Sequence, residues 1–160
     1  MAISKTLNRL ALGNFLPYRL TKLSGIISRS LAERYSRQFE VSIHEWRVIA
    51  IIGETPGLTA REVGDLASLD KVNISRAIEK LEKRGRLERK VTAHDRRAFA
   101  LQLTDAGEEI LRAIGPLALE FETRLLDGFS KSEVATIRSF LDRLDTRADE
   151  LVDIMKEGGE

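Results

Sequence analysis

Two short helical patterns, roughly 59–67 and 71–84, are separated by only three residues. The first begins with Thr59, and a glutamate follows at Glu62, which is the spacing of a capping box. The second follows Asp70, whose carboxylate can accept hydrogen bonds from the first free backbone amides of a helix. Two capped helices joined by so tight a turn predict a helix-turn-helix.

The second helix of this pair has one apolar face, formed by Ile74, Ile78 and Leu81 with Ala77 at its border. We expect this face to pack against the first helix, where Gly64 and other small residues allow a close approach. The opposite face and its flanks carry donors, a hydroxyl and a methyl-bearing side chain, namely Lys71, Val72, Asn73, Ser75, Arg76 and Lys80. A helix that enters the major groove of DNA needs this mixture, because Arg and Asn read base edges while Lys and Ser bind phosphates.

Gly85 is a helix-ending glycine, and two strand-like runs, roughly 86–92 and 98–103, follow it. Their apolar residues alternate with polar or small ones and should form one buried face: Leu87, Val91, Phe99, Leu101 and Leu103. A hairpin directly after a helix-turn-helix predicts a winged helix-turn-helix, which we expect to span residues 41–104.

The tip of this hairpin, His94-Asp95-Arg96-Arg97, has an unusual composition for a turn. Arginine is favoured in a narrow minor groove because the negative potential there is strong. Asp95 could accept the guanidinium of Arg97 and set its direction. Arg96 is assigned more loosely to phosphate, and the residue types leave open which arginine enters the groove.

The distribution of charge also favours an anion-binding site. The formal net charge is only +1, yet residues 71–97, which include Lys90, hold ten basic and four acidic residues. Residues 120–160 hold eleven acidic and six basic residues. One basic block in a nearly neutral chain is typical of a nucleic-acid site, although a solvated run of charge is the alternative.

Four further helices are predicted, roughly over 15–38, 43–54, 105–127 and 131–156. Their starts are marked by capping boxes at Ser42 and Ser130 and by a capping residue at Thr104. Gly115-Pro116 should kink or break the third of these helices, because proline removes a donor and clashes with the preceding turn. The fold class is therefore mainly α with a small β-hairpin.

The last helix carries apolar residues at a 3-4 spacing over about three heptads: Val134, Ile137, Leu141, Leu144, Ala148, Leu151 and Met155. This seam could cover the core of its own chain. The long first helix, with Leu16 and Leu20, adds more apolar surface than a fold of this length easily buries. We therefore expect a two-fold homodimer whose helical dimerisation region is 1–40 and 105–160 of a single 1–160 domain.

Several classes of function are excluded by composition. The chain has no cysteine and only two histidines, so we expect no metal, no cofactor and no thiol-based sensing. His94 and Asp95 on a hairpin tip are a poor place for a catalytic base, so we expect no enzyme. The N-terminus lacks the apolar core of a secretory signal, and no stretch approaches the ~18 apolar residues of a membrane span. A cytoplasmic protein is predicted.

The segment "DKVNISRAIEKLEKRGRLERKVTAHDRRAFALQLTDAGEEI" resembles the MarR family of transcriptional regulators. The resemblance rests on the "LEKRG" helix end, the D-x-R wing of Asp95 and Arg97, and "LT" before Gly107. "EWRVIAIIGE" and "GLTAREVGDLA" match as well, so nearly the whole chain is covered. It implies a dimeric DNA-binding protein, with Arg97 in the minor groove of a pseudo-palindromic operator.

The same resemblance implies a repressor that is released by a small, often aromatic and anionic, ligand at the junction of the dimerisation and DNA-binding regions. Near that junction the sequence offers aromatic surface and cations: Pro17, Tyr18, Arg19, His44, Trp46 and Arg47. Core packing of Trp46 and ion pairing of Arg47 and His44 are the alternatives. A regulator that binds DNA without any ligand, or an architectural DNA-binding dimer, also remains open.

Overall fold

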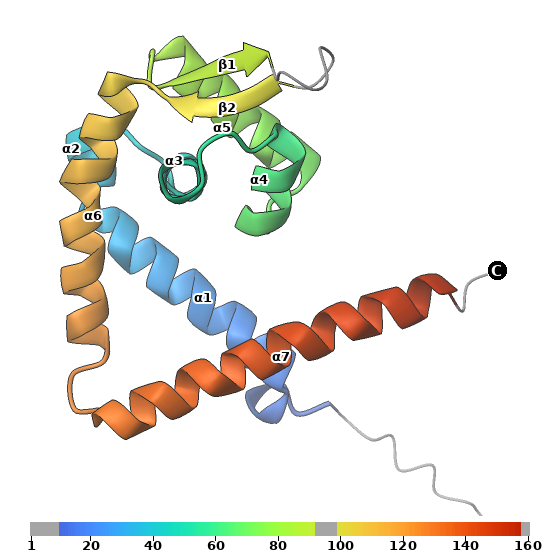
Figure 1. Ribbon diagram of the computed structural model, residues 1–160. Helices are drawn as coiled ribbons and strands as arrows, with labels where there is room; N and C mark the ends of the chain where they lie inside the picture. Colours follow the sequence, from blue (N-terminus) through green and yellow to red (C-terminus); the bar gives the residue numbers. More distant parts are fainter. Residues whose placement is uncertain (1–9, 92–98, 158–160) are drawn as a thin grey trace, which may run out of the picture. The chain divides into compact units, whose positions relative to one another are not determined.

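The computed structural model describes residues 10–91 and 99–157, which fall into two compact units, Met1–Leu119 and Glu120–Glu160. Figure 1 shows the helices and strands, which in chain order are η1 (Leu12–Asn14), α1 (Leu16–Glu33), α2 (Ser36–Phe39), α3 (Ile43–Glu54), α4 (Ala60–Ala67), α5 (Lys71–Lys83), β1 (Leu87–Val91), β2 (Phe99–Leu103), α6 (Asp105–Leu125) and α7 (Lys131–Glu157). The predicted mainly helical fold with one hairpin is confirmed.

The core of the first unit is built around α3. In Figure 1 this helix is seen along its axis, with the hairpin on one side and α4 beside it. Four elements of the winged helix-turn-helix and α6 supply fully buried side chains, which include Val48, Ile49, Ile52, Val63, Ile78, Leu81, Leu101 and Ile114. The apolar face predicted for the second helix of the pair is confirmed, because Ile74, Ala77, Ile78 and Leu81 are all buried.

The helix starts follow the capping pattern of the sequence. Ser42, Thr59 and Ser130 each accept from the backbone amide three residues on, while the glutamate at that position reaches back. The Thr104 hydroxyl accepts from the amide of Gly107 at 3.2 Å. These bonds satisfy amides that a helix start leaves free, so the predicted starts coincide with the observed ones.

The hairpin is antiparallel, with Leu87 opposite Leu103 and Val91 opposite Phe99. Leu87 and Leu101 are buried as expected, but Val91 and Phe99 are 59% and 45% exposed. The prediction of one buried face along the whole hairpin is therefore wrong at its outer end, where both apolar side chains are exposed.

A short backbone pairing next to the hairpin had no sequence signal. The amide of Leu101 donates to the carbonyl of Leu58 at 2.8 Å, and the amide of Gly57 donates to the carbonyl of Leu101 at 3.1 Å. The segment before α4 is thereby bonded to β2. These two hydrogen bonds connect the hairpin to the segment that leads into the helix-turn-helix.

The prediction of one helix over 15–38 is wrong, because α1 ends at Glu33 and α2 begins only at Ser36. Tyr35 between them has φ −127° and ψ −28°. Its side chain is buried, with the ring 5.9 Å from that of Trp46 on α3. The change of direction brings a large aromatic ring into the core, and this burial offsets the lost helical hydrogen bonds. Burial also raises the pKa of Tyr35 to about 12, although the nearby charge of Arg47 acts in the opposite direction.

Pro116 lies inside α6, which continues through it. Of the predicted kink or break, the break is therefore wrong. A proline in this place removes one backbone donor, while the buried Ile114 and partly buried Leu117 anchor the helix on both sides.

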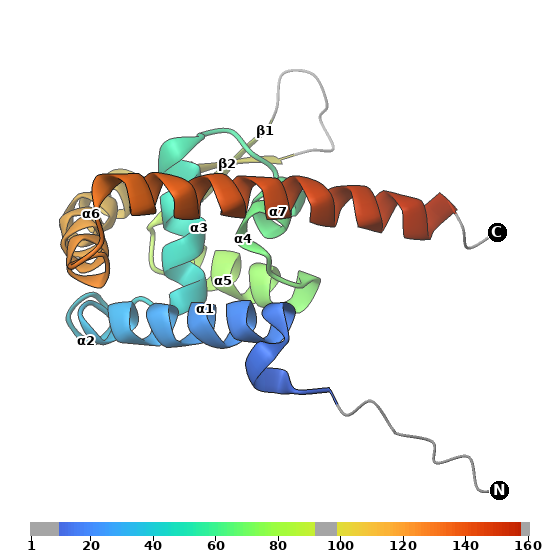
Figure 2. The ribbon, with the colours of Figure 1, turned by 90° about the horizontal axis from the view of Figure 1, so that it is seen from below.

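The second unit consists of the end of α6 and the single long helix α7 (Figure 2). The start and length of α7 agree with the prediction over 131–156. Arg138 of α7 pairs with Glu122 of α6 at 3.2 Å. Within the described residues, no helix has the length and apolar character that a membrane span requires.

Candidate nucleic-acid interface

Helix α5 is capped at both ends. Asp70 accepts from the amides of Val72 and Asn73 at 2.9 and 2.8 Å. These bonds are the main reason that the pKa of Asp70 is lowered, and the charge of His44 contributes to the same shift. At the other end Gly85 adopts the left-handed conformation, with φ 65°, and its amide donates to the carbonyl of Glu82 at 2.9 Å. The helix that presents the candidate DNA face therefore has fixed ends.

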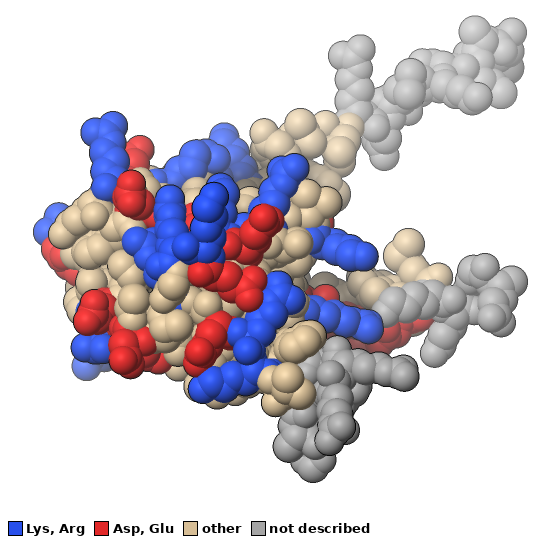
Figure 3. All heavy atoms as spheres, turned by 90° about the horizontal axis from the view of Figure 1, so that it is seen from above, with Lys and Arg blue, Asp and Glu red and all other residues tan. Residues whose placement is uncertain are grey.

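The side chains that the sequence assigns to DNA on α5 lie on its exposed side. Lys71, Val72, Ser75, Arg76 and Lys80 are all exposed. Asn73 is half-buried, and its side-chain amide donates to the second oxygen of Asp70 at 2.7 Å, so one of its polar groups serves the cap. Seen from the side on which the hairpin lies, Lys and Arg side chains gather in a broad group with acidic side chains between them (Figure 3).

Some cations of the basic block are paired with carboxylates of the chain itself. Arg89 on β1 makes two hydrogen bonds to the carboxylate of Glu82 on α5, at 2.8 and 3.2 Å. Lys90, which the sequence assigned to DNA, pairs with Glu88 at 3.0 Å. Fewer cations of the basic block are therefore available to an external anion than its sequence indicates. The four predicted wing-tip residues His94, Asp95, Arg96 and Arg97 lie outside the described residues.

His44 lies beside the candidate DNA face. Together with Ser42 at the start of α3, it borders a cavity of about 210 Å³ along one side of α5. The α5 residues that line this cavity are Asn73, Arg76, Ala77 and Lys80. Sequence reasoning missed Ser42 for this surface, because its capping role accounts for its position.

The six candidate effector residues lie in different surroundings. Tyr18 and Arg19 line a cavity of about 420 Å³ along α1. Trp46 packs against Tyr35, and Arg47 donates to the carbonyl of Ala67 at 3.3 Å and to the hydroxyl of Ser28 at 3.2 Å. The carbonyl of Pro17 accepts from the hydroxyl of Thr21 at 3.0 Å. The geometry of Trp46 and Arg47 favours packing and hydrogen bonding over ligand contact.

A third cavity, of about 440 Å³, lies between α4, α5 and β1. Its apolar lining includes Ala60, Leu69, Ile74 and Ile78, and its polar lining includes Arg61, Asp65, Lys71, Ser75 and Arg89. Because Arg89 is paired with Glu82, Arg61 and Lys71 against Asp65 leave the cavity one net positive charge. A small apolar anion would suit it chemically.

The predicted dimer residues are largely solvent-exposed in the single chain. Leu16 and Leu20 on α1 are exposed, and so are the seam residues Ile137, Leu141, Leu144, Leu151 and Met155 on α7, while Val134 is half-buried. Such a row of exposed large apolar side chains is typical of an interaction surface.

A two-helix turn with a capped, cation-bearing second helix and an adjoining antiparallel hairpin defines a winged helix-turn-helix protein. The sequence model of the MarR family matches residues 39–98, from the end of α2 through the hairpin loop. The resemblance to the MarR family, a family of transcriptional regulators, is thereby confirmed.

Curated relatives and solved structures agree with this assignment. The chain is 25% identical to the HTH-type transcriptional regulator PecS of Dickeya dadantii (strain 3937) over 79% of this chain and 77% of PecS. It is 28% identical to the transcriptional repressor MprA of Escherichia coli (strain K12) over 84% of this chain and 81% of MprA. A crystal structure of a MarR/EmrR family regulator from Acinetobacter sp. ADP1 shares the fold, with a TM-score of 0.81 and 24% identity over 88% of this chain and 99% of that one.

Two further structures with this fold contain binding partners. The repressor CouR, bound to a 23-mer DNA duplex, has a TM-score of 0.71 and is 22% identical over 84% of this chain and 94% of that one. The PcaV regulator of Streptomyces coelicolor, in complex with its natural ligand, has a TM-score of 0.70 and is 23% identical over 88% of this chain and 98% of that one.

Proposed function

We propose that this chain is a homodimeric, sequence-specific DNA-binding repressor that a small aromatic anion releases from its operator. The observation that carries the proposal is the exposed face of α5. There Lys71, Val72, Ser75, Arg76 and Lys80 project from a helix that is capped at both ends. The fold is shared with a repressor solved on DNA, which adds support.

On this proposal Arg76 reads a base edge, while Lys71 and Lys80 bind phosphates. His44 belongs with this surface, because it shares a cavity with Arg76 and Lys80. Arg97 enters the neighbouring minor groove, and Asp95 holds its guanidinium.

The dimer is proposed from the exposed apolar side chains of α1 and α7. Burying this surface supplies the free energy of association. Two-fold symmetry then places two recognition helices about one helical turn, ~34 Å, apart on a pseudo-palindromic operator.

The first experiment selects binding sites for the full chain from a pool of random DNA duplexes and measures affinity over a range of salt. We expect a two-fold symmetric site. Arg76→Ala should lose much of its preference for that site over random DNA, because the contact to a base edge is gone. Lys80→Ala should weaken both alike and lower the salt slope by about 1. Equal losses on both DNAs for Arg76→Ala would contradict base readout, and recovery of no symmetric site would contradict the function itself.

Two cavities of the first unit suit a small aromatic anion. The cavity along α1 offers Tyr18 and Arg19, and the cavity between α4, α5 and β1 offers an apolar floor with Arg61 and Lys71. We favour the second, because a ligand there contacts α5 directly and can bind one orientation of that helix better than another. Such a difference in affinity is what shifts a population away from DNA.

A thermal-shift screen with aromatic acids and their thioesters tests release by a ligand, since a compound that binds the folded chain raises its melting temperature. Arg61→Gln should abolish the shift if the cavity between α4, α5 and β1 is used, and Arg19→Gln should abolish it if the cavity along α1 is used. A chain that binds its operator but responds to no compound of this class supports the alternative, a regulator that works without ligand.

A further inference from the structure

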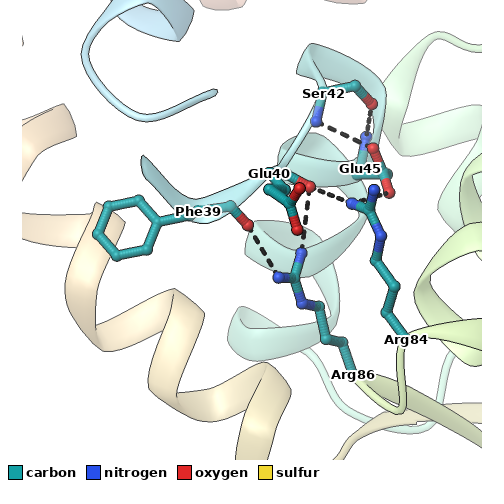
Figure 4. Close-up of polar contacts among 6 residues, drawn as sticks. All are labelled: Phe39, Glu40, Ser42, Glu45, Arg84 and Arg86. Carbon is teal, nitrogen blue, oxygen red and sulfur yellow. Dashed lines mark hydrogen bonds and ion pairs between the residues drawn. The ribbon is translucent and has the colours of Figure 1, made fainter. Parts of the chain in front are cut away.

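Two arginines at the junction between α5 and the hairpin bind the backbone of another part of the first unit (Figure 4). Arg84 ends α5, and Arg86 directly precedes β1. The Arg84 guanidinium donates to the carbonyl oxygen of Glu40. Arg86 donates to that oxygen at 3.2 Å and to the carbonyl oxygen of Phe39 at 2.8 Å. We call these residues, together with Glu45, the arginine clasp.

The acceptors of the clasp are the last carbonyls of α2. Glu40 has φ 51° and ψ 48°, a left-handed conformation that ends the helix. Carbonyls at a helix C-terminus have no partner within the helix and carry partial negative charge. A guanidinium group supplies both the missing hydrogen-bond donors and a compensating positive charge. Charge-assisted hydrogen bonds of this kind are stronger than neutral ones.

Glu45 adds a charge to the same place. Its side chain is only 3% exposed, and Oε2 accepts from the amide of Ser42 at 2.9 Å. Oε1 is buried without a hydrogen bond among the described residues and lies 3.6 Å from Nη1 of Arg84. A buried carboxylate is costly without a partner of opposite charge, so Arg84 compensates the charge of Glu45.

The backbone of Arg86 is held from the other side. Its carbonyl accepts from the amide of Thr104 at 3.2 Å, and a Cβ at Gly107 would lie 2.1 Å from that oxygen. Residues 84–86 are therefore fixed by α2, by the start of α3 and by the start of α6.

We propose that Arg84 and Arg86 are positioning residues that set the direction of α5 and of the hairpin relative to the dimer axis, and so determine which spacing of half-sites the protein accepts. This rests on the proposed function. Helix α5 is ~20 Å long at 1.5 Å per residue. A tilt of about 10° at its clasped end moves the far end by about 3 Å, close to one base-pair step of ~3.4 Å.

The test uses the full chain and the operator recovered from random DNA. Affinity is measured for the selected site and for sites with one base pair inserted or removed between the half-sites. We expect the unaltered chain to disfavour the altered sites by about tenfold, the order of loss that one mismatched base pair causes. For Arg84→Gln and Arg86→Gln we expect that ratio to fall to about threefold or less.

Two further measurements separate positioning from other roles. The salt slope of both variants should equal that of the unaltered chain, because the clasp does not bind phosphate. Lys83→Gln removes a neighbouring exposed charge that takes no part in the clasp, and it should keep the full spacing preference. Should Arg86→Gln fail to fold, Arg86→Lys, which keeps the charge and fewer donors, should show an intermediate ratio.

Each outcome has a distinct meaning. A folded clasp variant that binds all three sites more weakly by one common factor would overturn the inference and leave the proposed function standing. A changed salt slope would make the arginines DNA contacts instead of positioning residues and would likewise overturn it. If the unaltered chain selects no symmetric site, the proposed function fails first, and the inference fails with it.

Discussion

Gly107 in α6 offers a sharp test of the packing around residue 86. A Cβ at this position would lie 2.1 Å from the carbonyl oxygen of Arg86, 3.1 Å from its carbonyl carbon and 3.2 Å from Cβ of Leu103. Two of these atoms belong to the backbone and cannot rotate away. Gly107→Ala therefore requires α6 and the start of β1 to separate.

Gly64 in α4 is a matched control. It is also a buried helical glycine, but a Cβ there would meet Ile74 at 3.5 Å, which is ordinary contact. In a helix interior, alanine is favoured over glycine by about 1 kcal/mol. Forcing an extra carbon into a packed site costs about 1–3 kcal/mol. Gly64→Ala should thus be neutral or more stable by up to about 1 kcal/mol, while Gly107→Ala should lose up to about 2 kcal/mol after its helical gain.

Urea unfolding followed by circular dichroism measures both variants, at one protein concentration because the proposed dimer would make stability depend on concentration. The helix-propensity gain is similar in both variants, so the difference between them isolates the cost of overpacking. Equal stabilities, or a more stable Gly107→Ala, would refute the close approach of α6 to residue 86.

Three other outcomes are expected. Arg97→Ala should weaken operator binding by about 1–3 kcal/mol with the dimer intact, whereas Arg96→Ala should weaken all DNA alike; the reverse result would exchange their roles. Glutamates in place of Leu141 and Leu144 should yield monomers in light scattering with helix content retained, and persistent dimers would move the interface elsewhere. The pKa of Tyr35 is raised to about 12, so the folded state should lose stability as pH rises from 10 through 12, and Tyr35→Phe should remove this loss in unfolding experiments at several pH values.

The features that the sequence predicted well are local. Capping needs only residues three apart, so the starts at Ser42, Thr59 and Ser130 could be read directly. The buried face of α5 followed from its spacing for the same reason. The break at Tyr35 could not be predicted, because it depends on a ring contact with Trp46 that exists only in the folded chain.

The arginine clasp was missed for a related reason. Its donors and acceptors are 44 to 47 residues apart, and its acceptors are backbone carbonyls, which leave no trace in residue type. One signal was present. Glu45 shares a helical face with Val48, Ile49 and Ile52, and a charge on an apolar face requires a partner.

The internal use of cations from the basic block bears on how quickly such a protein could find its site. Arg84, Arg86, Arg89 and Lys90 are occupied by carbonyls or carboxylates of the chain itself. Residence on unrelated DNA depends on how many cations are left for phosphates. A regulator that keeps part of its charge for its own fold leaves wrong sequences sooner, and it samples more of a genome in the same time.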